Sequence, residues 1–171
     1  KGDNYIFLDA NENPYGNGLN RYPDPFQQEL KAVIGRHKQV DSAYMVLGNG
    51  SDEIIDMLVR SFVEPGEDHI LVHAPGFSMY AVSAETLGAE VREFRLNEVF
   101  QPELDTLRQA VDAHTKLAFF CTPNNPTGNR LDPQVIEQFA LEFAGLVVID
   151  EAYIDFSGQT SFLHKIDEIP N

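Results

Sequence analysis

Short runs of consecutive apolar residues alternate along the chain with longer segments in which apolar residues recur every three or four positions. The runs have the length of buried strands and the longer segments have the period of amphipathic helices. Uninterrupted apolar strands that alternate with helices predict an α/β fold, in which helices cover both faces of a mostly parallel sheet as three layers, α/β/α. We expect strands at residues 44–47, 70–73, 91–96, 117–121 and 146–149, and helices at residues 26–37, 54–62, 78–87 and 103–113 and from residue 133 onward.

Residues 1–25 are crowded with Asn, Gly, Pro and Asp, which favour turns over long regular elements. We therefore expect an extended N-terminal arm at residues 1–25 and a domain over residues 26–171. The 171 residues suffice for one packed core and not for several. Because the sequence begins with Lys1 and not with methionine, we expect its N-terminus to be cut.

The charge balance disfavours polyanionic partners. Lysine and arginine number 12 against 27 aspartates and glutamates, a net charge of −15, which repels phosphate backbones and anionic membranes. The single cysteine, Cys121, forms no disulfide within the chain and fits a reducing compartment. No apolar run approaches a membrane span or a signal-peptide core. We expect a cytoplasmic protein that binds neither nucleic acid nor membrane.

The residues that follow each strand are the candidate site, since ligands of parallel sheets bind beyond the carboxyl ends of the strands. Residues 48–52, Gly-Asn-Gly-Ser-Asp, follow the first expected strand and open a helix. Glycine lets a ligand approach the backbone, and the first amides of a helix attract phosphate. Taken alone, the pattern more often marks an ordinary tight connection between a strand and a helix. Glu53 stands at the third glycine position of the dinucleotide-binding motif, so NAD is disfavoured.

Three further strand ends carry aromatic, amide and carboxylate side chains. Phe77 and Tyr80 follow the second strand, although each alone would pass for a core residue. Residues 124–128 have the composition of a β-turn, from which Asn125 would project its amide toward the site. Asp150 ends the run Leu-Val-Val-Ile and precedes Tyr153. A carboxylate in such apolar surroundings requires a partner, so we expect a base, a metal or a cationic cofactor atom beside it.

Two apparent metal motifs fail. Residues 9–13 imitate the start of a calcium loop, but Pro14 replaces its glycine and Asn20 its final glutamate. His69 and His73 are four residues apart, yet their segment is an expected strand and lacks the glutamate of a zinc-protease helix. We expect both histidines to be structural, and we expect no metal site.

Taken together, the strand ends describe one ligand: a phosphate on a helix N-terminus, a ring to stack, a ring oxygen near an amide and a phenol, and a protonated ring nitrogen near a carboxylate. This ligand is pyridoxal phosphate. Five segments carry a family resemblance: 8–16 (LDANENPYG), 20–25 (NRYPDP), 48–53 (GNGSDE), 121–128 (CTPNNPTG) and 148–153 (VIDEAY). On these segments the chain resembles the fold-type-I, pyridoxal-phosphate-dependent aminotransferases, and NENP with RYPDP narrows the resemblance to the histidinol-phosphate aminotransferase family.

The resemblance implies a role for each matching residue. The cofactor phosphate would be held by the backbone of Gly50, Ser51 and Asp52, and its ring stacked by Phe77. Asn125 and Tyr153 would bond the 3-oxygen of the ring, and Asp150 would keep the ring nitrogen protonated for the chemical step. Asp150 and Tyr153 are thus the expected catalytic residues. Tyr22 would reach the cofactor phosphate of the neighbouring subunit in a homodimer, and Asn13 and Asn125 would face the substrate.

The family moves an amino group between L-histidinol phosphate and 2-oxoglutarate in histidine biosynthesis, and its Schiff-base lysine lies beyond the strand that ends in Asp150. Lys165 is the single lysine after Asp150, and its setting, Leu-His-Lys-Ile-Asp, fits an amphipathic helix with a solvated amine. We therefore expect a partial large domain, without its later strands, its catalytic lysine and its C-terminal small domain, that is inactive alone.

Other function classes stay open. Within the same fold, an aminotransferase or a decarboxylase could act on another amino acid. A non-catalytic module could bind phosphate without a lysine. A serine hydrolase could use Ser78, although Tyr80 replaces the second glycine of the G-x-S-x-G elbow.

Overall fold

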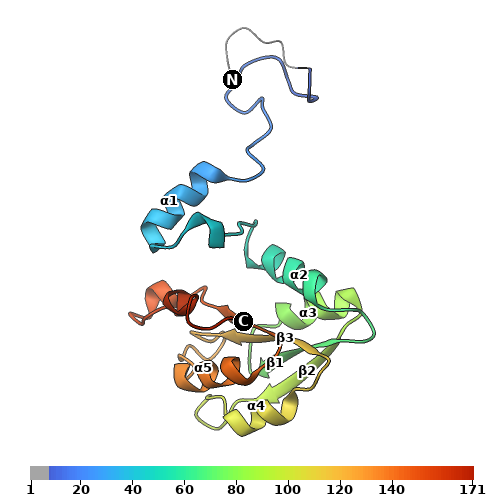
Figure 1. Ribbon diagram of the computed structural model, residues 1–171, viewed down its shortest axis with the longest axis vertical. Coiled ribbons are helices and arrows are strands. Elements are labelled where there is room, and N and C mark those ends of the chain that lie inside the picture. Colours follow the sequence, from blue (N-terminus) through green and yellow to red (C-terminus); the bar gives the residue numbers. More distant parts are fainter. Residues whose placement is uncertain (1–7) are drawn as a thin grey trace. The chain divides into compact units, whose positions relative to one another are not determined.

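The computed structural model describes residues 8–171, and these fall into two compact units that divide between Leu47 and Gly48. Figure 1 shows the elements along the chain. The predicted boundary between an arm and a domain at residues 25 and 26 stays a prediction, and residues 1–7 of that arm lie outside the described residues.

The first unit contains the helix α1 (Gln28–Lys38) and the short 3-10 helix η1 (Ser42–Tyr44). Residues 8–27 form neither helix nor strand. The Asp24 carboxylate accepts hydrogen bonds from the backbone N–H groups of Phe26 and Gln28, at 3.0 Å each, and so satisfies donors at the start of α1. These backbone bonds lower the pKa of Asp24.

The strand expected at residues 44–47 is absent, which corrects the sequence prediction. Tyr44 ends η1, and residues 45–47 have no regular structure. An apolar run forms a strand only when a neighbouring strand accepts its backbone hydrogen bonds. Among the described residues, every paired strand belongs to the sheet of the second unit, and residues 44–47 join none of them.

The second unit is built around a sheet of β1 (His69–Ala74), β2 (Glu90–Arg95), β3 (Thr115–Cys121) and β4 (Leu146–Asp150). The strands are ordered β2-β1-β3-β4, and all neighbouring pairs are parallel. The helices are α2 (Ser51–Phe62), α3 (Met79–Leu87), α4 (Leu104–Ala110) and α5 (Pro133–Glu142), followed by the 3-10 helices η2 (Ile154–Phe156) and η3 (Phe162–Lys165). The α/β prediction is confirmed, and the observed bounds of these strands differ from the predicted ones by a residue or two.

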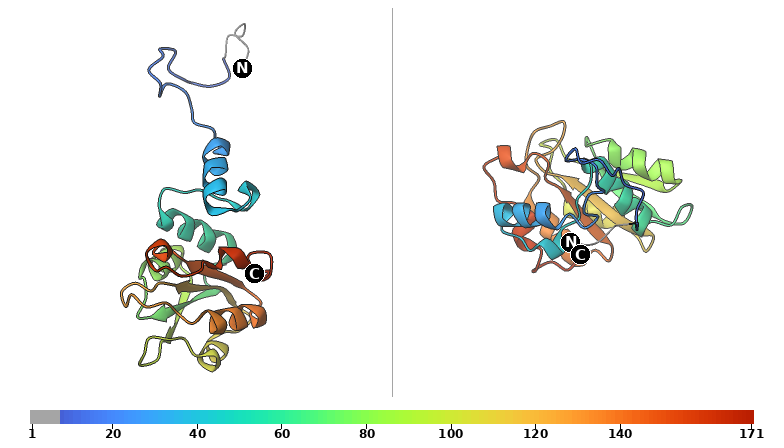
Figure 2. Two further views of the ribbon diagram at one scale, coloured as in Figure 1. Left: turned by 90° about the vertical axis from the view of Figure 1, so that its left-hand side faces the viewer. Right: turned by 90° about the horizontal axis from the view of Figure 1, so that it is seen from above.

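Helices cover both faces of the sheet, as Figures 1 and 2 show. α2 and α3 pack on one face, where buried residues include Ile55, Val59, Tyr80 and Ala84. α4 and α5 pack on the other, with Leu107, Ile136 and Phe139. Along β3, Leu117 and Phe119 belong to the first cluster while Ala118 and Phe120 belong to the second. Burial on both faces explains the near-continuous apolar runs of the central strands β1 and β3, whereas the edge strand β2 mixes apolar and charged residues.

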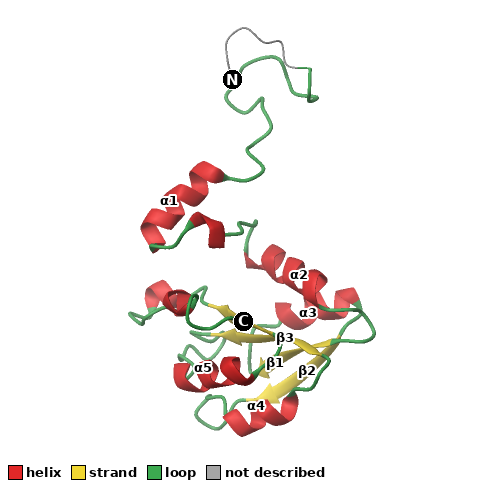
Figure 3. Ribbon diagram, viewed as in Figure 1, coloured by secondary structure: helices red, strands yellow, loops and turns green. Residues whose placement is uncertain are grey.

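Figure 3 shows the helices α3 and α5 in red, and the ends of these two helices follow signals in the sequence. The Asp132 carboxylate accepts from the backbone N–H of Gln134 at 2.9 Å and caps α5, with Pro133 in the first turn. α3 ends at Gly88, which adopts a φ of +85° that other residues rarely adopt. α4 is shorter than expected because a turn at Asp112 leads into β3. In this turn the Asp112 carboxylate accepts a hydrogen bond from the His114 N–H at 2.8 Å.

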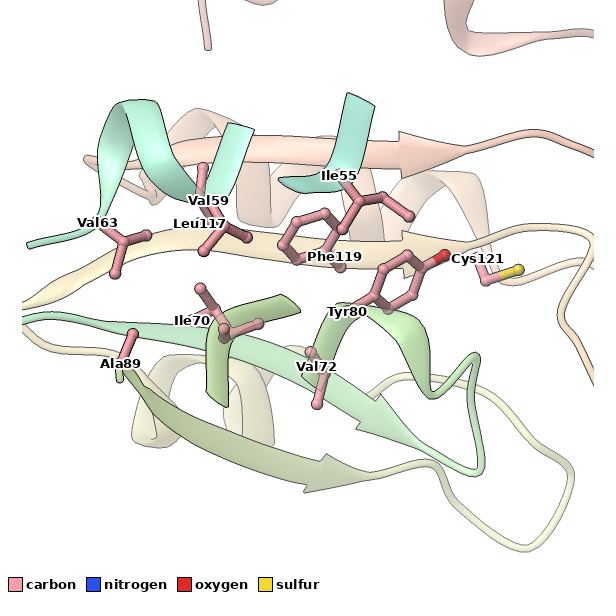
Figure 4. Packing of buried hydrophobic residues seen from close by; sticks show 11 residues of the cluster. Ile55, Val59, Val63, Ile70, Val72, Tyr80, Ala89, Leu117, Phe119 and Cys121 are labelled. Carbon is pink, nitrogen blue, oxygen red and sulfur yellow. The ribbon is translucent and has the colours of Figure 1, made fainter. Parts of the chain in front are cut away.

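Phe119 lies at the centre of the first cluster and is fully buried (Figure 4). Because truncation of such a ring leaves a cavity, we expect F119A to lower the free energy of unfolding by about 3–5 kcal/mol. The matched control is F62A, at the half-exposed end of α2, which should cost less than about 1 kcal/mol. Urea unfolding of the two variants measures both values, and equal losses would contradict this assignment of the core.

Candidate functional site

Three segments meet at the carboxyl edge of the sheet, because β1, β3 and β4 are adjacent and parallel. Cys121 at the end of β3 is in register with Asp150 at the end of β4. Beyond this pair, the Thr122 N–H donates to the Asp150 carbonyl at 2.9 Å. From the third segment, the Pro75 carbonyl accepts from Asn124 Nδ2 at 3.1 Å. The predicted loops of the site are therefore in direct contact.

The Asp150 carboxylate is half-buried and bonded through both oxygens. Its Oδ2 accepts from the Tyr80 hydroxyl at 2.7 Å, and its Oδ1 accepts from the Ala152 N–H at 3.0 Å. The side-chain partner that the structure shows for this carboxylate is therefore a phenol, and the base, metal or cationic cofactor atom expected from the sequence stays a prediction. Both bonds fix the orientation of the carboxylate.

Tyr80, whose hydroxyl bonds this carboxylate, contacts two other aromatic rings. The Tyr80 ring is 1% exposed and stacks on Phe119, with centroids 4.6 Å apart and planes 16° apart. The half-buried Phe77 ring meets the edge of Tyr80 at 5.4 Å and 80°. Tyr80 is therefore a core residue by its burial, and the half-buried Phe77 packs against the same core cluster.

A surface depression of about 360 Å³ lies beside the end of β4. Asn125 and Tyr153, which the resemblance assigns to one oxygen of the cofactor, both line this depression. Tyr153 is 45% exposed, so its phenol is accessible to a ligand. The full lining is Pro123, Asn124, Asn125, Pro126, Gly128, Tyr153, Phe156 and Ser157.

Gly50, Ser51 and Asp52, for which phosphate binding stays a prediction, lie at the start of α2. Gly50 precedes the helix with a φ of +87°, a conformation that favours glycine, and no side chain caps the first turn. The first amides of α2 are therefore available to an anion. Figure 4 shows Ile55, in the first half of α2, near the arrowhead end of β3 and Tyr80, with Val63 at the opposite end. The first half of α2 thus lies toward the carboxyl edge of the sheet.

Asn13 and Tyr22 belong to the first unit. Asn13 Oδ1 accepts from the Tyr15 N–H at 3.0 Å, and the Tyr22 N–H donates to Glu12 at 2.8 Å. These bonds describe the first unit alone, and the roles of Asn13 and Tyr22 toward a ligand stay predictions.

A hydrogen-bond network of His73, Asn124, Pro75 and Cys121 joins the loops at this edge, and the sequence did not reveal it. The Pro75 carbonyl accepts from His73 Nδ1 at 3.0 Å as well as from Asn124, while His73 Nε2 accepts from the Cys121 N–H at 3.1 Å. Burial lowers the pKa of His73, so the ring is neutral. His73 thus has the structural role predicted for it. The feature of the sequence that could have indicated this network is a histidine and an asparagine next to apolar strands. His69 likewise bonds Thr115 Oγ1 through Nε2, at 2.6 Å.

Glu151 holds the segment that carries Tyr153. Its carboxylate accepts from the Ser161 hydroxyl and from the Phe162 N–H at 2.9 Å. These contacts close residues 151–162 into a loop against the end of β4. No motif in the sequence pointed to this pairing, because the partners are separated by an irregular segment.

Lys165 lies in a short 3-10 helix and not in the amphipathic helix expected for it. Its ammonium lies 3.0 Å from Glu168 and 3.7 Å from Glu137. The hydrogen bond to Glu168 raises the pKa of Lys165, whereas a lysine that attacks a carbonyl must be neutral. Lys165 is therefore suited to ion pairing and not to Schiff-base formation.

Two negative observations cover residues 8–171. Within them, no cluster of three or more His, Cys, Asp or Glu side chains has the arrangement of a metal site. Over the same residues, no helix combines the length and the apolar character that crossing a membrane requires.

Comparisons with known proteins agree with this geometry. The family model described as aminotransferase class I and II matches residues 8–171. The histidinol-phosphate aminotransferase of Flavobacterium johnsoniae is 49% identical over 166 residues, which cover 97% of this chain and 48% of that protein. The chain thus spans about half the length of the curated relatives it matches.

Solved structures share the fold. The histidinol-phosphate aminotransferase from Clostridium acetobutylicum aligns with a TM-score of 0.77 and 27% identity over 88% of this chain and 45% of that one. The enzyme of that name from Sinorhizobium meliloti, solved in complex with pyridoxal-5'-phosphate, aligns with a TM-score of 0.71 and 25% identity, covering 79% and 37% of the two chains.

The neutral, buried His73 predicts how stability depends on pH. Its pKa is lowered in the folded protein from the ordinary value of 6.5, so below about pH 6.5 the unfolded chain takes up a proton that the folded protein does not. Stability should therefore fall on acidification, by up to about 1.4 kcal/mol per pH unit for this proton. His69, whose pKa burial also lowers, adds to the fall.

Urea unfolding between about pH 7.5 and pH 5 measures this slope. H73Q should flatten the slope by up to one proton, whereas the control H37Q, at an exposed histidine of α1, should leave it as it is. An H73Q slope identical to that of the original protein would show that His73 is protonated in the folded state.

Proposed function

The chain belongs to the aminotransferase class I and II family, and from this premise we propose that it is part of a pyridoxal-phosphate-dependent histidinol-phosphate aminotransferase. The reaction would exchange an amino group between L-histidinol phosphate and 2-oxoglutarate, as one step of histidine biosynthesis in the cytoplasm. The observation that carries the proposal is the Asp150 carboxylate at the end of β4, flanked by the depression that Asn125 and Tyr153 line.

The donor set of the described residues fits the cofactor. A phosphate requires uncapped amides, which the start of α2 supplies, and Gly50 has open space where a side chain would stand. A pyridine ring requires an aromatic neighbour and a carboxylate, which Phe77 and Asp150 supply at the same edge of the sheet. We propose that these groups hold pyridoxal phosphate together with Asn125 and Tyr153.

Each residue would have a distinct task. When bound, the cofactor accepts the electron pair that the substrate leaves as its Cα–H bond breaks. Asp150 would hold a proton on the ring nitrogen, and Asn125 and Tyr153 would donate hydrogen bonds to the ring oxygen. Phe77 would fix the plane of the ring, and the amides of Gly50, Ser51 and Asp52 would bind the phosphate. Asn125 would also face the substrate.

The first unit would complete the site across a homodimer. We propose that Tyr22 reaches the cofactor phosphate of the neighbouring subunit and that Asn13 faces the substrate. The amine that bonds the cofactor covalently would come from a lysine outside residues 8–171, since Lys165 is engaged by Glu168 and Glu137. A serine hydrolase is not supported, because backbone groups occupy both ring nitrogens of His73, a histidine near Ser78 in sequence.

Loss of the Asp150 charge should impair chemistry more than binding. In the full-length enzyme, D150N should lower kcat by roughly 10²–10³-fold while KM changes little, because the charge acts on the transition state. The matched control D105N removes a carboxylate that is 85% exposed on α4 and should leave both constants unchanged. Steady-state kinetics would contradict the assigned role if D150N kept its kcat.

The substrate itself is tested by a screen of amino donors. With 2-oxoglutarate as acceptor, the full-length enzyme should use L-histidinol phosphate with a higher kcat/KM than any common amino acid, as measured by glutamate formation. A preference for another donor would replace the substrate while leaving the family intact. Formation of carbon dioxide from the donor would identify a decarboxylase.

A further inference from the structure

Tyr80 lies between the two side chains that the proposed function aims at the cofactor ring. Its hydroxyl donates to Asp150 Oδ2 at 2.7 Å, and its ring edge meets Phe77 with centroids 5.4 Å apart. Tyr80 belongs to α3 and Asp150 to β4, 70 residues apart in sequence. One buried side chain thus contacts both the expected stacking ring and the expected carboxylate.

The position of Tyr80 is set by the core. Its ring is 1% exposed and stacks on Phe119 of β3 at 4.6 Å, and it packs in the same cluster as Ile55 of α2 (Figure 4). A ring held in this way has little freedom to rotate, so the direction of its hydroxyl is fixed by the sheet. The hydroxyl then fixes one oxygen of Asp150, while the Ala152 N–H fixes the other.

The surroundings keep the phenol a hydrogen-bond donor. Burial raises the pKa of the Tyr80 hydroxyl, and burial also raises the pKa of the Cys121 thiol, which interacts with Asp150 as well. Neither group therefore adds a negative charge next to the carboxylate near neutral pH. Donation from a neutral phenol favours the charged form of a carboxyl group, which is the form that binds a protonated ring nitrogen.

On this geometry we propose that Tyr80 is a positioning residue, which holds the Asp150 carboxylate against the ring nitrogen of the cofactor and supports the Phe77 ring that stacks on it. This inference rests on the proposed function. Tyr80 contacts no ligand itself, and it acts through Asp150 and Phe77. Neither the family resemblance nor the motifs in the sequence assigned it this role.

The test compares two ligands that differ only at the ring nitrogen. Pyridoxamine phosphate and its analogue with CH in place of the ring nitrogen both bind without a covalent bond. Their dissociation constants would be measured by calorimetry on the cofactor-free, full-length enzyme. The original enzyme should prefer pyridoxamine phosphate, because only that ligand pairs with Asp150.

The variant Y80F removes the hydroxyl and keeps the ring. It should weaken binding of pyridoxamine phosphate roughly 10-fold, the loss of one hydrogen bond to a charged group, and leave binding of the analogue unchanged. Equal weakening of both ligands, or of neither, would overturn the proposal, since a merely structural role makes no distinction at the ring nitrogen. The matched control Y44F, at an exposed tyrosine of the first unit, should change neither constant.

A second variant covers the case in which Y80F does not fold, as judged by circular dichroism. Replacement of Tyr80 by 4-aminophenylalanine keeps the ring and a weaker donor, and it should reduce the preference for pyridoxamine phosphate without abolishing it. An unchanged preference would count against the proposal. Failure of the original enzyme to bind pyridoxamine phosphate would instead refute the proposed function, so the two failures are distinguishable.

Discussion

The pairing of β3 with β1 on one side and β4 on the other is the constraint on which the site depends. β3 is buried on both faces, with Phe119 toward α2 and α3 and Phe120 toward α4 and α5. Because the three strands are parallel, their carboxyl ends stop at one edge. The register that places Cys121 beside Asp150 therefore brings together the loops that carry Phe77, Asn125 and Tyr153.

Where the ladder of backbone hydrogen bonds ends, buried polar groups need other partners. β1 pairs with β3 as far as Leu71 and Ala118, and beyond this pair the His73 ring accepts a hydrogen bond from the Cys121 N–H. His73 and Asn124 then share the Pro75 carbonyl. The groups that satisfy the end of the sheet are thus the same groups that fix the loops of the candidate site, so packing and site geometry have one physical cause.

The sequence predicted the elements that local pattern determines and missed those that depend on partners. Asp132 and Gly88 marked helix ends because capping acts within a few residues. The strand expected at residues 44–47 was wrong, since a local apolar run says nothing about a neighbour to pair with. The bond from Tyr80 to Asp150 was unpredictable for the same reason, as it depends on the order of strands across 70 residues. Asp150 itself was evident, because a carboxylate after four apolar residues requires explanation.

A protein of net charge −15 must bind a phosphate through local groups and not through its overall field. At physiological ionic strength, exposed charges more than about 8 Å away are largely screened. Near the start of α2, Asp52 and Glu53 oppose an anion, but the Glu53 carboxylate is already engaged by the backbone and side-chain N–H groups of Asn49. The amides that follow Gly50 remain uncapped. Affinity for phosphate would then be set by these few donors, and in this way an acidic chain would accommodate the anionic cofactor proposed for it.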